Sequence, residues 1–219
     1  MPQNYYTFLP DGVTIRSEKA LSSRYIYAPL CGPDARTVKS AVTPYLSGDI
    51  KLDKGQYLTK PMSREDLRQP VRNFFVSFNG KNAVSFHDEA RPGDGSFVEV
   101  GQLWHRTRRV FGEAGLEIEA LNFVPVSGET LELMRVIVRN TGSAPIRITP
   151  TAVVPVFGRA LANKHDHEHV TALLHRTKQV EQGVLVEPAM LFNEEGHRPC
   201  TSVYYVFGCD ADGKDPRGS

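Results

Sequence analysis

Hydrophobic and polar residues alternate along several short stretches of the chain, which is the pattern of a β-strand with one buried face. The alternation is clearest in residues 116–126, "LEIEALNFVPV", where Leu116, Ile118 and Ala120 share one face and glutamates occupy the other. Further strands are expected at residues 72–78, 82–87, 97–111, 131–140, 146–157, 183–188 and 201–208.

Turn-forming residues separate these strands. Asn79 and Gly80 tolerate positive φ at both turn positions, so they predict a β-hairpin between the first two strands, with Lys81 widening the turn. The stretches "GEAG" at 112–115 and "NTGSAP" at 140–145 predict two more turns. Short strands joined in this way predict an all-β fold, an antiparallel β-sandwich.

Helical signals are few. Ser63 is a suitable N-cap with Glu65 and Asp66 in the first turn, which predicts one short helix over residues 62–69. Residues 169–178 are compatible with either a strand or a helix. The Rossmann, P-loop and Gly-x-Ser-x-Gly fingerprints are absent from the sequence, as is the strand–helix alternation of a parallel α/β sheet.

Charge and cysteine content narrow the class of protein. The 219 residues carry 26 basic and 25 acidic side chains, a balance that argues against a nucleic-acid partner or an acidic membrane surface. Three cysteines, without a Cys-x-x-Cys pair, favour a reducing compartment over a disulfide framework. We find no signal-peptide pattern and no apolar run of about 18 residues, so a cytoplasmic protein without membrane contact is expected.

Three long segments of the chain resemble a known family. They are residues 42–67, residues 101–160, which contain "LEIEALNFVPVSGETLELMRVIVRNTG", and residues 165–176, "HDHEHVTALLHR". In this order they are similar to the N-terminal β-sandwich of the glycoside hydrolase family 94 phosphorylases, formerly glycosyltransferase family 36. Within that family the pattern is nearest to the 1,2-β-oligoglucan phosphorylases, and the resemblance runs from Val13 to Gly208.

The resemblance implies both a fold and a reaction. Residues 1–208 would form a supersandwich of the galactose-mutarotase type. Independently of the resemblance, the polar, turn-rich composition of residues 209–219 predicts a C-terminal loop or linker. In the family this domain precedes an (α/α)6 barrel, which carries the general acid and binds phosphate. The family reaction is inverting phosphorolysis of a β-glucan, with inorganic phosphate as co-substrate and α-glucose 1-phosphate as product.

The resemblance also implies what this chain does not do by itself. Its 219 residues leave no room for the barrel, so we expect no catalytic residue within it and no activity without the barrel. The implied role is a carbohydrate-binding and dimerisation module of a β-glucan phosphorylase that binds a β-gluco-oligosaccharide, forms a homodimer and needs no cofactor or metal. The alternative is a stand-alone carbohydrate-binding or structural β-sandwich, because one fold serves many functions.

Residues 159–176, "RALANKHDHEHVTALLHR", hold four of the seven histidines. Three interpretations stay open: a solvated connector, a metal site using His165 and His169 at helical i, i+4 spacing, and a sugar-contacting loop. The family resemblance implies the third, because a loop at this place reaches a partner's sugar subsite in cellobiose-type phosphorylases. The expected substrate-binding residues are Arg159, Asn163, Asp166, His167, His169 and Arg176.

Two features of the 97–111 stretch are candidates of lower priority. Trp104 could stack on a sugar ring, although its place on an alternating strand favours the core. Arg106 and Arg108 could bind phosphate, but alternation places them on one face as a solvated stripe.

Overall fold

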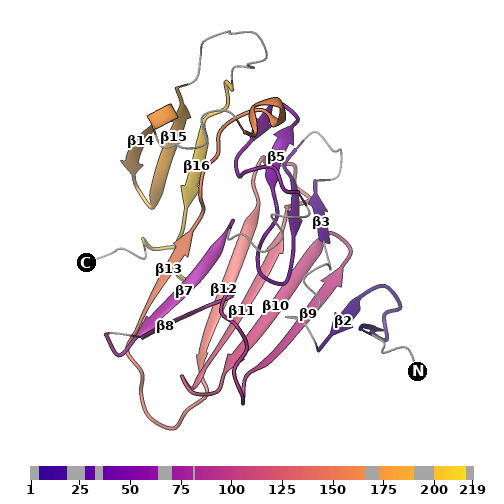
Figure 1. Cartoon of the computed structure of the whole chain (residues 1–219), viewed down its shortest axis with the longest axis vertical. Helices are drawn as coiled ribbons and strands as arrows, with labels where there is room; N and C mark the ends of the chain where they lie inside the picture. Colours follow the sequence, from indigo (N-terminus) through magenta and orange to yellow (C-terminus); the bar gives the residue numbers. More distant parts are fainter. Residues whose placement is uncertain are drawn as a thin grey trace. The chain divides into compact units, whose positions relative to one another are not determined.

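The computed structural model describes residues 5–18, 28–32, 37–63, 71–80, 82–165, 173–189 and 200–215 (Figure 1). Their regular structure is antiparallel β-strand apart from short 3₁₀ segments at 161–163 and 173–174, so the all-β prediction is confirmed. Most of the short helix expected at residues 62–69 lies outside the described residues. No helix in the described ranges is long and apolar enough to cross a membrane.

The chain divides into two compact units. Unit 1 comprises residues 1–50 and 62–153, and unit 2 comprises residues 51–61 and 154–219. Residues 51–61 therefore belong to unit 2, although the residues directly before and after them belong to unit 1. All three cysteines, Cys31, Cys200 and Cys209, are free thiols.

Unit 1 is built around a six-stranded antiparallel sheet, in which the four longest strands lie side by side (Figure 1). In spatial order its strands are β1 (Thr7–Phe8), β2 (Ile15–Ser17), β9 (Gly95–Gly101), β10 (Trp104–Phe111), β11 (Leu116–Phe123) and β12 (Leu133–Asn140). A three-stranded sheet consists of β13 (Ile148–Val153), β7 (Asn73–Phe78) and β8 (Asn82–Ser85), and β3 (Ala28–Cys31) pairs with β4 (Lys39–Val42).

The predicted alternation in β11 is confirmed. Leu116, Ile118 and Ala120 are buried on the inner face of the six-stranded sheet, whereas Glu117 and Glu119 belong to the outer face, where Glu119 is itself buried, at 8% exposed. Each β-strand residue shares its face with the residue directly opposite in the next strand, so the register assigns the faces of the neighbouring strands as well.

Distant segments of unit 1 cover the inner face. The Thr107 hydroxyl on β10 donates to the Pro44 carbonyl at 3.2 Å, which places the loop after β4 against the sheet. Arg109, also on β10, donates to the Asp88 carbonyl at 2.6 Å, which does the same for the loop after β8. The core of unit 1 therefore depends on contacts between segments far apart in the sequence.

The predicted hairpin at Asn79 and Gly80 is confirmed. Both residues have positive φ, 51° and 74°, and the register joins Phe78 to Asn82, so the loop has three residues. The single strand expected at residues 97–111 is wrong, because a turn at 102–103 divides it into β9 and β10. Leu103 takes φ 63° there, and a leucine gives no sequence signal for a left-handed turn position.

Unit 2 contains a second three-stranded antiparallel sheet, of β14 (His175–Val180), β15 (Gly183–Pro188) and β16 (Tyr204–Phe207) (Figure 1). Most of β5 (Ile50–Asp53), all of β6 (Gln56–Tyr57) and the 3₁₀ turn η2 (Leu161–Asn163) also belong to it. Its small core is made of Val186, Cys200 and Tyr204, with Leu58 and Val156 packed against them. Within the ambiguous stretch 169–178, residues 175–178 belong to strand β14 and residues 173–174 are 3₁₀.

Candidate functional site

The base of the predicted sugar loop is fixed in unit 2 by backbone pairing. The segment that opens the loop runs alongside residues 54–58, so its first residues are held as if in a short sheet. The hydrogen bonds are Phe157 N to Leu58 O (2.6 Å), Tyr57 N to Arg159 O (3.0 Å) and Leu161 N to Lys54 O (2.8 Å). These contacts set the direction in which the chain enters the loop.

His175 holds the other end of the loop. Its Nε2 lies 3.0 Å from the Phe157 carbonyl, and since a carbonyl only accepts, Nε2 donates this bond. Partial burial lowers the pKa of His175, and the hydrogen bond to Phe157 opposes that shift. Gly158 makes the approach possible: a Cβ on it would lie 2.8 Å from Nε2, and its φ is +60°. The two ends of the loop are therefore joined at a fixed point.

Two of the predicted binding residues support this base from inside. Arg159 is only 2% exposed, with its guanidinium 4.3 Å from the centroid of the Phe157 ring. Asn163, at the end of η2, is fully buried, and its backbone N donates to the Ala160 carbonyl at 3.1 Å. Both side chains lie in the interior of unit 2, so a contact between them and a sugar stays a prediction.

The remaining predicted residues are distributed differently. Arg176 is exposed on β14, directly opposite Glu187 of β15. Asp166, His167 and His169 lie outside the described residues, so their proposed roles are untested. Among the described residues no group of three His, Cys, Asp or Glu side chains could hold a metal ion.

Sequence reasoning missed His175, which ties the loop closed. A histidine at a strand start carries no signal of its own, because its partner Phe157 lies 18 residues earlier. Sequence reasoning also favoured the core for Trp104. In the structure Trp104 is half-buried on the outer face of the six-stranded sheet, on the same face as Arg106 and Arg108. Because Trp104, Arg106 and Arg108 are two residues apart on one strand, the alternation that predicts exposed arginines also predicts Trp104 on the same face.

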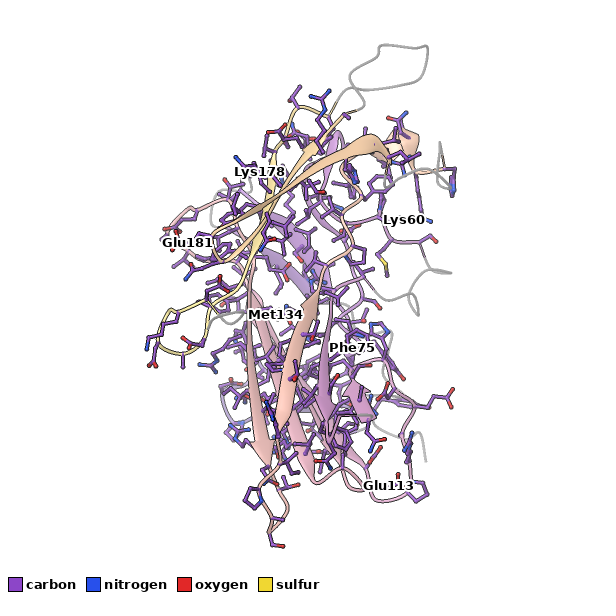
Figure 2. The ribbon with its side chains drawn as sticks, turned by 90° about the vertical axis from the view of Figure 1, so that its left-hand side faces the viewer. Lys60, Phe75, Glu113, Met134, Lys178 and Glu181 are labelled. Atoms are coloured by element: carbon purple, nitrogen blue, oxygen red, sulfur yellow. The ribbon has the colours of Figure 1, made fainter. Side chains whose placement is uncertain are left out.

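A hollow of about 240 Å³ lies elsewhere in unit 1, around the turns that follow β8 and β10. Its lining contains four carboxylates, one guanidinium and two aromatic rings: Asp88, Glu89, Asp94, Glu113, Arg91, Phe78 and Phe111. Glu113 is labelled at this end of the strands in Figure 2. None of the residues predicted to bind substrate lines this hollow.

Comparison with known proteins adds no relative. No protein-family model matches the chain, and no curated protein matches it.

Proposed function

We propose that this chain is the carbohydrate-binding and dimerisation module of an inverting β-glucan phosphorylase, acting in the cytoplasm beside a catalytic (α/α)6 barrel. The observation that carries the proposal is the ordered resemblance of residues 42–67, 101–160 and 165–176 to the family's N-terminal sandwich. The antiparallel β-structure of residues 101–160 supports it, since they supply β10 to β13 in unbroken order.

The loop at residues 159–176 is the part of this module that we assign to substrate. Its base is fixed by the pairing with residues 54–58 and by the bond between His175 and Phe157, so its polar side chains start from a rigid support. Guanidinium, carboxylate and imidazole groups suit vicinal sugar hydroxyls, because they donate or accept two hydrogen bonds at once. The general acid and the phosphate site belong to the barrel in this proposal, so the module binds sugar without cleaving it.

Arg176 offers a direct test, because β14 carries a matched control. Arg176 and Lys178 are both exposed on this strand and two residues apart, so they share a face (Lys178 is labelled in Figure 2). We expect Arg176→Ala to weaken binding of β-gluco-oligosaccharides in calorimetric titrations by about fivefold, through loss of a charged donor. Lys178→Ala removes the same charge and should leave binding unchanged. Equal effects of both variants would refute a specific role for the loop.

Activity measurements test the rest of the proposal. The purified chain, incubated with phosphate and β-1,2-gluco-oligosaccharides, should release no glucose 1-phosphate. Release of this product by the chain alone would contradict a module without a general acid.

A stand-alone carbohydrate-binding sandwich is the second candidate, favoured by the half-buried Trp104 on an open sheet face. Titrations with β-1,2-, β-1,3- and β-1,4-linked oligosaccharides distinguish the two. A sub-millimolar Kd for the isolated chain would favour a stand-alone binding protein. Weak binding would favour a module that supplies part of a site completed by the barrel.

A further inference from the structure

Trp104 is the single tryptophan of the chain, and its indole lies over Gly101 on the outer face of the six-stranded sheet. The two residues are directly opposite each other on β10 and β9. A Cβ on Gly101 would fall 2.2 Å from the indole Cε2 and Nε1, so the ring occupies the space that a larger residue would fill. The strand backbone therefore supports the ring, which stays half-buried.

An apolar row continues from Trp104 across the sheet. Phe123 of β11 lies opposite Trp104, and Leu133 of β12 lies opposite Phe123, so all three side chains share the outer face. Phe123 is half-buried and Leu133 is 38% exposed. Neighbouring strands are about 4.8 Å apart, so the row spans roughly 10 Å. We call Gly101, Trp104, Phe123 and Leu133 the Trp104 row.

A polar row runs beside it. Arg106 is the outer-face residue next to Trp104 on β10, and its side chain is 37% exposed. The nearly buried Glu99 carboxylate accepts from Arg106 Nε at 2.9 Å and from Nη2, which fixes the guanidinium. Arg106 Nη1 has no hydrogen-bond partner within the described ranges. The exposed Arg135 stands next to Leu133 on the far side.

Four arginines of this face are already paired with carboxylates. Glu99 also accepts from Arg16 Nη1 at 2.8 Å, so two arginines share this carboxylate. Glu117 is likewise shared, with Arg139 at 2.6 Å and Arg108 at 3.5 Å. Arginines already paired with carboxylates are poor sites for a polyanion, because the carboxylates repel it. Their remaining N–H groups can still donate to uncharged hydroxyls.

We propose that the Trp104 row binds a gluco-oligosaccharide, as a second carbohydrate site separate from the loop at residues 159–176. Indole, phenyl and leucine side chains contact the C–H face of the sugar rings, and Arg106 and Arg135 donate to the hydroxyls at their edges. The glucose units and the β-linkage of this ligand rest on the proposed function, whereas the apolar row and its arginine donors do not.

Intrinsic tryptophan fluorescence reads this site alone, because the chain has one tryptophan. The whole chain is titrated with β-1,2-, β-1,3- and β-1,4-gluco-oligosaccharides, with an unrelated polyol as the control for bulk solvent effects. We expect a saturable change with a Kd in the millimolar range for at least one linkage. A signal that never saturates, or no signal, overturns the proposal. A change produced by diluting the chain without sugar also overturns it, because a second copy would then cover the row.

Two variants test the geometry. Gly101→Ala displaces the indole without removing any group, and should raise the Kd measured by fluorescence about tenfold. Arg135→Ala changes an exposed side chain, which leaves the core intact, and should raise the same Kd about threefold. Phe207→Ala is the control, since Phe207 stacks on Tyr205 in an exposed aromatic pair of unit 2. Undiminished binding in Arg135→Ala and in a folded Gly101→Ala overturns the proposal.

The loop and the row fail separately. Arg176→Ala should change the calorimetric titration and leave the fluorescence titration intact. If Arg176→Ala leaves calorimetric binding unchanged while the Trp104 fluorescence still saturates, only the proposed loop role is refuted. If Arg176→Ala weakens calorimetric binding while the Trp104 fluorescence does not respond to sugar, only the Trp104 row is refuted.

Discussion

Polar side chains on the two faces of β10 differ in burial and in the partners that they bond. His105, Thr107 and Arg109 point inward and are at most 1% exposed, whereas Trp104, Arg106 and Arg108 on the outer face stay half-exposed. The inner hydroxyl and guanidinium donate to carbonyls of distant segments, and the outer arginines pair with carboxylates beside them. Inner polar groups therefore join segments of the fold, and outer ones keep groups available for a ligand.

The adjacent residues Arg108 and Arg109 give the largest contrast. Arg109 Nη1 donates to the Ser85, Phe86 and Asp88 carbonyls, and the guanidinium lies 4.7 Å from the Phe111 ring centroid. Arg109→Ala should lower the free energy of unfolding by about 3 kcal/mol, because buried carbonyls lose their donor and a cavity forms. Urea titration measures the change.

Arg108→Ala is the matched control. Its side chain is 38% exposed and its ion pair with Glu117 is long, at 3.5 Å, so the loss should stay below about 1 kcal/mol. Comparable losses in the two variants would remove the distinction between the faces.

His105 sharpens the comparison through pH. Burial, reinforced by the positive charge of Arg72, lowers the pKa of His105 to about 3. The unfolded chain binds a proton near pH 6.5, so stability is complete above that pH and falls as the pH drops toward 3. Between pH 7.5 and pH 5 the loss assigned to His105 is about 2 kcal/mol.

Replacing the imidazole isolates this effect. In His105→Gln, the decrease in unfolding free energy between pH 7.5 and pH 5 should shrink by about 2 kcal/mol. The residual slope comes from the partly buried His87 and His175, whose pKa values are also lowered. Asp88 and Arg109, the charges that act on His87, are unchanged in this variant. An unchanged slope would mean that His105 is solvated or partnered in the folded protein.

Gly158 tests the base of the loop in unit 2. Gly158→Ala strains a residue at φ +60° and brings Cβ to 2.8 Å from His175 Nε2, so a loss of about 1–2 kcal/mol is expected, together with faster proteolysis within residues 159–176. Gly80→Ala is the control, because Gly80 has φ +74° but nothing within 4 Å of its added Cβ. A loss no greater than that of Gly80→Ala would show that the His175 contact does not hold the loop.

The sequence predicted strands well and their partners poorly. Period-two alternation located β11 and its faces, and Asn79-Gly80 located a hairpin, because both signals are local. The turn at Leu103 was missed, because the conformation of that leucine is imposed by strand pairing rather than by its own preference.

Burial of polar residues escaped prediction for a related reason. Alternation on β10 places Arg109 on the face opposite Arg108, but it cannot show that a charged side chain is buried there, since its acceptors lie at residues 85–88, more than 20 residues away. The sequence led us to propose the loop as a site, but its base could not be predicted, because the residues that pair with it come from 54–58, about a hundred positions earlier.

The smallest expected effect concerns the outer ion pairs themselves. Glu117 accepts from Arg139 at 2.6 Å and lies 3.5 Å from Arg108, with its own side chain 12% exposed and those of the arginines 47% and 38%. Glu117→Gln should lower the free energy of unfolding by about 0.5–1 kcal/mol, because the arginine partners remain solvated.

The dependence on salt distinguishes the ion pairs of Glu117 from the buried pair between Glu132 and Arg72. The Glu117→Gln loss should fade as ionic strength rises, since exposed charges are screened over about 10 Å at 0.1 M. Glu132→Gln provides the contrast: Glu132 pairs with Arg72 at 2.9 Å, with side chains 6% and 2% exposed, so its loss should be about 3 kcal/mol and insensitive to salt. A Glu117 effect as large and as salt-resistant as that of Glu132 would show that the outer face is covered in the folded protein, and a covered face has no room for a ligand at Trp104.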